Sequence, residues 1–173
     1  MKACSFFGHR DTPQTDELKH KVRETVERLI VGEGVDTFLF GSRSKFDELC
    51  LFVVSELKRV YPNIKRVYIR SQYLSIEKGY EEYLLQFYDD TIMPFRLNGA
   101  GRASYVERNQ EMIDGSDYCV FYFDSTYLPR ERRYSKNCLT EYQPKSGTWL
   151  AFNYACQKKR CGRLVEIINL RDE

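Results

Sequence analysis

The feature that most constrains the fold is a strand–turn–helix unit in residues 37–60. It opens with a short, largely apolar run from Thr37 to Phe40, the size of a buried strand. A polar turn follows, beginning at Gly41. Open α/β sheets bind ligands with such units, because the loop after a strand meets the free N–H groups of a helix N-terminus. Apolar residues then recur in steps of three and four, which predicts an amphipathic helix; they are Phe46, Leu49, Cys50, Val53, Val54, Leu57 and Val60.

Local signals define the start of this helix. Ser44 is the expected N-cap, since its hydroxyl can accept a backbone N–H of the first turn. Asp47 and Glu48 lie in that turn, where the helix dipole favours acidic side chains. On its own, however, the segment is better explained as an ordinary connection between a strand and a helix.

Strand-sized and helix-sized segments alternate along the rest of the chain, which predicts an α/β fold built on a parallel sheet with right-handed crossovers. Tyr118 to Phe123 is the most strand-like run and is typical of a central parallel strand. Residues 71–90 are ambiguous between a tyrosine-rich helix and an irregular flap. The other expected strands are 2–7, 65–70, 91–94 and 164–170, and the other expected helices are 13–31 after an N-cap at Thr12, 103–113 and 147–159.

Length and composition restrict the class of protein. The chain has 173 residues with no linker or repeat, so residues 1–173 are expected to form a single domain. Its 27 basic and 25 acidic residues give a net charge of +2, so no overall field draws it to nucleic acid or to a membrane. No apolar run reaches the ~20 residues of a membrane span, and the first residues lack the features of a signal peptide. We therefore expect a cytoplasmic protein with no membrane partner.

The six cysteines indicate a reduced environment and not a metal or redox site. No pair has the C-x-x-C spacing of such sites, and Cys156 and Cys161 lack a third ligand. We therefore expect no bound metal and no cofactor. Four cysteines lie in expected strands or on apolar helix faces, where a free thiol behaves as a small hydrophobe: Cys4, Cys50, Cys119 and Cys156.

Three glycine-containing turns are candidates for a ligand site. Gly8-His9-Arg10 and Gly41-Ser42-Arg43 follow expected strands, and Ser146-Gly147-Thr148 begins the last helix. An arginine can pair a phosphate bidentately, and hydroxyls with free N–H groups can cradle one. Each turn alone is better explained as a cap or a turn, but in a doubly wound sheet all three converge on one crevice. None matches a Walker A loop or a G-x-G-x-x-G fingerprint, so a P-loop nucleotidase or an NAD dehydrogenase is not expected.

Catalytic residues do not stand out. Asp47, Glu48, Asp124 and Glu141 are candidate acids, but no spacing singles one of them out. The pair Arg108-Asn109, taken alone, indicates a solvated helix face. Composition and spacing therefore reveal no enzyme chemistry.

Several short motifs, in order along the chain, resemble those of one superfamily. Over nearly its whole length the chain resembles the SLOG superfamily, which includes the LOG phosphoribohydrolases and DNA-processing protein A. It is most similar to the small SLOG proteins of Gram-positive bacteria and their mobile elements. The matching motifs are Phe6-Phe7-Gly8-His9-Arg10, Phe40-Gly41 with Phe46-Asp47, Arg108-Asn109, Asp117-Tyr118 before a strand, and Ser146-Gly147-Thr148 with an alanine-rich helix.

The resemblance implies a Rossmann-like open, mainly parallel sheet with helices on both faces, and a nucleotide or nucleotide-derived ligand in its crevice. Ser42 and Arg43 belong to the turn after Gly41 and are included in the expected ligand site. The residues that match by position and would line the crevice are Gly8, His9, Arg10, Gly41, Asp47, Arg108, Asn109, Ser146, Gly147 and Thr148.

Two departures from the superfamily bear on function. LOG enzymes carry a Pro-Gly-Gly-x-Gly-Thr-x-x-Glu motif whose glutamate serves in N-glycosidic cleavage. Here Gly147-Thr148 is followed by Trp149-Leu150-Ala151, with no acid at the matching place, which argues against LOG-type hydrolysis. The segment 124–145 is also longer and more basic than in the superfamily, either as a lid over an anionic ligand or as an ordered surface loop.

Three functions fit these features. The first is a sensor or sequestering protein that binds a phosphate- or ribose-bearing small molecule, with Arg10, Arg43 and Arg108 as cations. Aromatic residues between Tyr73 and Tyr88 would stack on a base. The second is a hydrolase of an N-glycosidic or phosphate bond, with Asp47 or Asp124 as acid/base. The third is a nucleic-acid binder, which the near-zero net charge disfavours. The resemblance also implies a homodimer.

Overall fold

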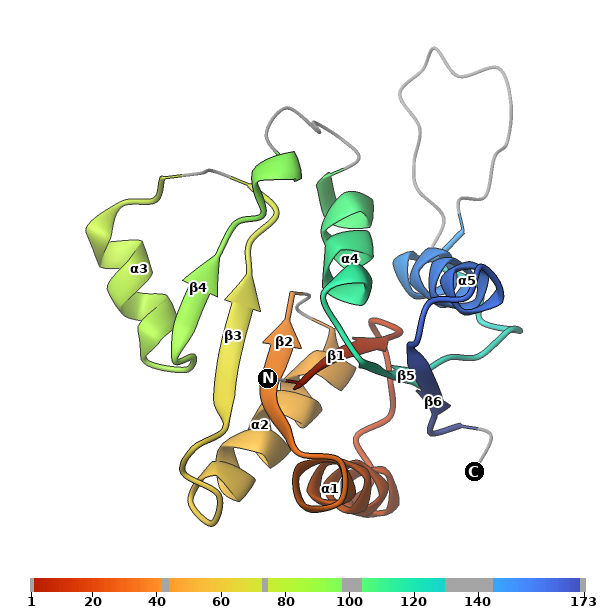
Figure 1. Ribbon diagram of the computed structural model, residues 1–173, viewed down its shortest axis with the longest axis horizontal. Coiled ribbons are helices and arrows are strands. Elements are labelled where there is room, and N and C mark those ends of the chain that lie inside the picture. The colour runs from red at the N-terminus through yellow and green to blue at the C-terminus, as the bar shows by residue number, and fades with distance from the viewer. Residues whose placement is uncertain (1, 42–43, 73–74, 98–103, 130–144, 172–173) are drawn as a thin grey trace.

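The computed structural model describes residues 2–41, 44–72, 75–97, 104–129 and 145–171. These residues form a six-stranded, all-parallel sheet in the order β4-β3-β2-β1-β5-β6 (Figure 1). The expected α/β fold is therefore confirmed, and the sheet is entirely parallel. The elements are β1 Lys2–Gly8, α1 Asp16–Val31, β2 Val35–Phe40, α2 Lys45–Lys58, β3 Lys65–Ile69, α3 Lys78–Leu85, β4 Asp90–Ile92, the 3-10 turn η1 Phe95–Leu97, α4 Ser104–Asp114, β5 Tyr118–Tyr122, α5 Gly147–Arg160 and β6 Glu166–Asn169.

The strand order reverses beside β1. Strands β1 to β4 are laid down in one direction, and the chain then returns through α4 to place β5 on the other side of β1. In open α/β sheets the loops that follow two such diverging strands separate and leave a crevice at their carboxyl ends. The loops after β1 and β5 are therefore a candidate position for a ligand site in this fold.

Helices cover both faces of the sheet, and the central strands β1 and β5 divide their side chains between two cores. Cys4 and Phe6 of β1 belong to the core shared with α1 and α2, whereas Phe7 belongs to the core shared with α4 and α5. The same alternation holds in β5, where Val120 and Phe121 lie opposite Phe6 and Phe7 in the register. This period of two is typical of a sheet that is buried on both faces.

Three local predictions are wrong. The N-cap of α1 is Thr15, whose hydroxyl accepts the Leu18 N–H at 3.2 Å. Thr12 instead donates its hydroxyl to the His9 carbonyl at 2.7 Å and closes the loop before the helix.

Val60 lies beyond the end of α2 and is 65% exposed, so it is not part of the buried stripe. Strand β6 begins at Glu166 and not at Leu164, which is exposed.

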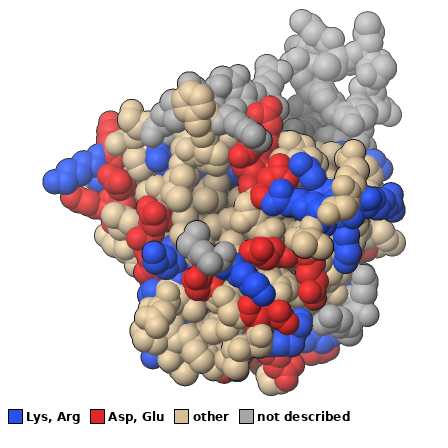
Figure 2. All heavy atoms as spheres, in the orientation of Figure 1, with Lys and Arg blue, Asp and Glu red and all other residues tan. Residues whose placement is uncertain are grey.

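The ambiguous region 71–90 contains a short helix, α3. It lies beside β4 at the margin of the sheet (Figure 1). None of the described helices combines the length and the apolar character needed to cross a membrane. Basic and acidic side chains are interspersed on the face drawn in Figure 2, in keeping with the small net charge.

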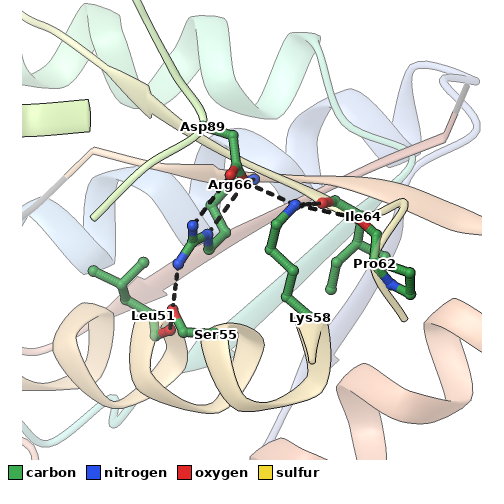
Figure 3. A network of polar contacts seen from close by, with 7 residues as sticks. All are labelled: Leu51, Ser55, Lys58, Pro62, Ile64, Arg66 and Asp89. Carbon is green, nitrogen blue, oxygen red and sulfur yellow. Dashed lines mark hydrogen bonds and ion pairs between the residues drawn. The ribbon is translucent and has the colours of Figure 1, made fainter. Parts of the chain in front are cut away.

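A polar network joins the start of β4 to β3 and α2 (Figure 3). The Arg66 guanidinium donates to both carboxylate oxygens of Asp89, from Nε at 3.2 Å and from Nη2 at 3.1 Å, and its Nη1 donates to the Ser55 hydroxyl at 3.0 Å. Lys58 lies 3.3 Å from the same carboxylate and donates to the Ile64 carbonyl. Partial burial alone would raise the pKa of Asp89, but the hydrogen bonds and charge of Arg66, with Lys58, lower it.

We expect Asp89→Asn to lower the free energy of unfolding at pH 7 by about 1–3 kcal/mol, because it weakens a charge-assisted, bidentate contact. A carboxyl whose pKa is lowered by folding stabilises the protein above its ordinary pKa, and that contribution is lost as the pH falls through the lowered value. Urea unfolding of the two proteins should therefore differ at pH 7, and the difference should shrink as the pH falls below 3.8, the ordinary pKa of the carboxyl. Asp90→Asn, at an exposed neighbouring carboxylate, is the control. Equal destabilisation by both substitutions would contradict the assignment.

Candidate functional site

The carboxyl end of β1 is packed so closely that only glycine fits. A Cβ on Gly8 would lie 2.3 Å from Cβ of Phe46, in the first turn of α2. The same turn is tied to the loop after β1, because the Lys45 N–H donates to the Arg10 carbonyl at 3.2 Å. These contacts position the N-terminus of α2 against the end of β1.

His9 joins the two loops that diverge at the strand reversal. Its side chain is buried, and its Nε2 accepts the backbone N–H of Asp124 at 3.0 Å. Its ring stacks on Tyr127 with centroids 3.9 Å apart. Burial lowers the pKa of His9, and only an unprotonated Nε2 can accept a hydrogen bond. The proton of the neutral ring therefore belongs on Nδ1, which is buried and has no hydrogen-bond partner among the described residues.

Asp124 organises the turn that follows β5. Its Oδ1 accepts the Thr126 backbone N–H at 2.8 Å and the Thr126 hydroxyl at 2.6 Å, and its Oδ2 lies 2.6 Å from Nη1 of Arg171. The Thr126 hydrogen bonds and the Arg171 charge lower the pKa of Asp124 below its ordinary value. A carboxylate held ionised in this way is a weak acid/base near neutral pH.

The Arg108-Asn109 pair is not a solvated helix face, because Arg108 is only 4% exposed. Its guanidinium passes directly over the end of β2, and a Cβ on Gly41 would lie 2.7 Å from its Nε. Nε and Nη2 donate to Oδ1 of Asn109 at 3.3 and 2.9 Å, and the group lies 5.5 Å from the centre of the Tyr105 ring.

The charge of Arg108 is balanced from the opposite face of the sheet. Burial lowers the pKa of Arg108, and the negative charge of Asp47 in α2 acts against that shift. Asp47 is itself buried in the first turn of α2, where its N–H donates to the Ser44 hydroxyl at 3.1 Å, so the predicted N-cap is confirmed. A buried pair of opposite charges thus lies at the carboxyl edge of the sheet.

The N-terminus of α5 approaches the same edge through Asn109. Ser146 caps the helix by accepting the Trp149 N–H at 3.0 Å. Asn109 and Gly147 line a narrow crevice between α4 and α5, too small to hold a water molecule. Thr148 is buried, so its hydroxyl does not line an open surface. A wider, shallow depression of about 370 Å³ lies elsewhere, between α1 and α2.

The structure thus gathers six of the twelve predicted site residues into three contacts at one edge. Gly8 packs on α2, His9 bonds to the chain at Asp124, and Gly41 lies under Arg108, which interacts with Asp47 and Asn109. Ser42 and Arg43 lie outside the described residues, as do residues 130–144 of the basic segment. Arg10 is exposed in the loop after β1.

Sequence reasoning missed the residues that support this edge. Tyr127 and Arg171 hold His9 and Asp124, and Met112 packs over Gly41, where a Cβ would lie 2.6 Å from its Sδ. An Asp-x-Thr sequence after a strand is a recognisable turn signal and could have located the Asp124 turn. The other contacts join distant parts of the chain and leave no local signal.

The aromatic segment between Tyr73 and Tyr88 does not lie at the strand reversal. Its helix α3 contacts β4, which is separated from β1 by β3 and β2. Tyr73 itself is outside the described residues. The rings of α3 therefore lie beside the edge strand, whereas Tyr88 packs on Phe40 near the end of β2, with ring centroids 5.8 Å apart.

Comparisons with known proteins assign no family. No family model matches this chain, and no curated protein is significantly similar to it.

We expect Gly8→Ala to destabilise the protein by about 1–3 kcal/mol or more. The added carbon would overlap Cβ of Phe46, which cannot move unless α2 shifts. Gly147→Ala is the matched control, since nothing lies within 4 Å of the added carbon. Its free energy of unfolding should change by no more than about 0.5 kcal/mol. Denaturant unfolding of both variants checks this, and a tolerated Gly8→Ala would show that α2 is not fixed by this contact.

We also expect the buried His9 to make the protein less stable in mild acid. Because folding lowers its pKa, the unfolded chain takes up a proton that the folded chain excludes, and stability falls as the pH drops below the ordinary value of 6.5. His9→Gln should therefore reduce the loss of stability between pH 7.5 and 5.5. His20→Gln, at the exposed histidine of α1, is the control. Identical pH profiles for all three proteins would refute the buried neutral state of His9.

Proposed function

We propose that this protein binds a phosphate- or ribose-bearing small molecule, such as a nucleotide or a nucleotide derivative, at the carboxyl edge of its sheet. It would act as a sensor or a sequestering protein. The observation that carries the proposal is the guanidinium of Arg108, buried over Gly41 at the end of β2.

A buried charge is costly, and structures retain one mainly where it is paired or used. Asp47 offsets part of the cost, and Asn109 receives two of the five N–H groups of the guanidinium. The planar group keeps further donors for the oxygens of an anion. Beside it, the N-terminus of α2 supplies the partial positive charge that also favours an anion.

Ligand binding is favoured over hydrolysis by the state of the candidate acids. Asp124 is engaged by Thr126 and Arg171 and has a lowered pKa, so it is poorly suited to donate or accept a proton. Asp47 is buried, and its negative charge opposes the lowering of the Arg108 pKa, so it serves as the counter-charge of that guanidinium. Nucleic-acid binding is disfavoured by the mixture of charges on the surface drawn in Figure 2.

We expect nucleotides to raise the melting temperature of the wild-type protein, because a ligand that binds only the folded state stabilises it by mass action. A panel of AMP, ADP, GMP, ADP-ribose, NAD, ribose 5-phosphate and inorganic phosphate covers the proposed class. For a compound that binds, Arg108→Gln should weaken the affinity by about tenfold or more, as expected for the loss of a charge-assisted contact. Arg28→Gln, in the last turn of α1, is the control. Isothermal titration measures both.

Three results would contradict the proposal. If no compound binds, or if Arg108→Gln and Arg28→Gln bind equally well, the site is wrong. If the wild-type protein releases base or phosphate on incubation and Asp47→Asn does not, the protein is a hydrolase. If short DNA binds with an affinity that falls steeply with salt while nucleotides do not bind, the protein is a nucleic-acid binder.

A further inference from the structure

Helix α3 exposes its apolar stripe. Of its eight residues only Leu84 is buried. Tyr80, Tyr83, Leu84 and Phe87 have the spacing of one helical face, yet the three aromatic residues are 38%, 51% and 45% exposed. Their rings form a row, with centroids 6.4 Å apart between Tyr80 and Tyr83 and 5.5 Å apart between Tyr83 and Phe87.

This exposure is concentrated in one region. Six of the twelve large hydrophobic residues that are exposed among the described residues fall between residues 80 and 95. A helix of eight residues is too short to be stable alone in water, so it depends on burial of its apolar face. α3 lies at the outer margin of the sheet (Figure 1) and buries little of that face on its own domain. Contiguous exposed apolar surface of this kind marks interaction sites.

The rim of the stripe is acidic. Glu77, Glu81, Glu82 and Asp90 are exposed, and Lys78 is the one basic residue between Glu77 and Asp90. Asp89 does not add to this rim, because Arg66 and Lys58 neutralise it. Four carboxylates against one ammonium give a local charge of −3. Acidic side chains accordingly gather at the margin of Figure 2 that α3 occupies in Figure 1.

The local negative charge distinguishes among the molecules that could bind to this surface. A second copy of the chain in a symmetric contact would bring like charges together, which is unfavourable at an interface. The phosphates of a nucleic acid would be repelled in the same way. A basic side chain, in contrast, can pair with the carboxylates and lie on the faces of the tyrosine rings.

We propose that the surface formed by Tyr80, Tyr83 and Phe87 with Glu77, Glu81 and Glu82, here called the α3 surface, docks a cationic, amphipathic segment of a partner protein. The apolar residues of that segment cover the row of rings, and its Lys or Arg residues face the glutamates. This is the helix-in-groove or helix-on-helix mode, in which anchors at helical spacing supply the affinity and charges supply the specificity. The proposal is independent of the ligand crevice.

The first test uses random 12-residue peptides displayed on phage. The library is selected on the full-length wild-type protein and counter-selected on the Tyr83→Ser/Phe87→Ser variant, which leaves the buried Leu84 in place. We expect the enriched peptides to carry a net positive charge and apolar residues at helical spacing. No enrichment, or enrichment of neutral or acidic peptides, would overturn the proposal.

The second test measures the affinity of the most enriched peptide by fluorescence anisotropy. Tyr83→Ser/Phe87→Ser should weaken binding by about tenfold or more, as for the loss of central aromatic contacts. Glu81→Gln/Glu82→Gln should weaken it less and should reduce its dependence on salt. Val31→Ser/Val60→Ser removes exposed apolar side chains elsewhere and should have no effect. Equal affinities for all four proteins would overturn the proposal.

Sedimentation tests whether a second copy of the chain covers the α3 surface. If the wild-type protein is a dimer that Tyr83→Ser/Phe87→Ser converts to a monomer, the α3 surface belongs to a second copy and the proposed partner is wrong. If the two proteins have the same oligomeric state, the surface remains available for the cationic segment.

Discussion

The contact between Gly8 and Phe46 is the constraint on which the candidate site depends. Because there is no room for a single carbon between the end of β1 and the first turn of α2, the helix N-terminus is held against the strand. This brings Asp47 to the carboxyl edge, with its N–H bonded to Ser44. Asp47 in turn provides the negative charge that opposes the burial of Arg108. One glycine therefore helps to place a buried carboxylate where its charge acts on the buried guanidinium.

The two ends of the sheet differ in how their polar groups are satisfied. At the amino end, Asp117 accepts the Ala3 N–H at 2.8 Å, and Arg66, Lys58 and Asp89 form a closed network. Such contacts satisfy one another and hold the strands in register. At the carboxyl end, the Nδ1 of His9 has no partner among the described residues, and Arg108 is charged and buried. Groups of this kind are costly to a fold and are typical of a site that meets a ligand.

The sequence predicted those features that depend on neighbouring residues. The alternation of strands and helices, and the caps at Ser44 and Ser146, follow from local spacing and were confirmed. Thr12 was predicted as an N-cap from such a local signal, but in the structure it is bonded to His9 and Thr15 caps the helix. The burial of Arg108 could not be predicted, since it requires Gly41, on a different strand, to leave space for the guanidinium. The exposure of the α3 rings could not be predicted either. The spacing of these residues indicates a helix, but it does not say whether another part of the protein covers its apolar face.

The proposed ligand site at the carboxyl edge and the α3 surface have opposite electrostatic character, so their proposed ligands differ. The proposed site combines the buried guanidinium of Arg108 with the N-terminus of α2, an arrangement that would favour an anion. The α3 surface combines aromatic rings with an excess of carboxylates, an arrangement that favours a cation. An anionic small molecule would therefore be repelled from α3, and a cationic segment would gain nothing from the buried guanidinium. Since β3 and β2 separate β4 from β1, we expect substitutions on the α3 surface to leave the contacts of Gly8 and His9 intact. The two surfaces can thus be assigned, or rejected, one without the other.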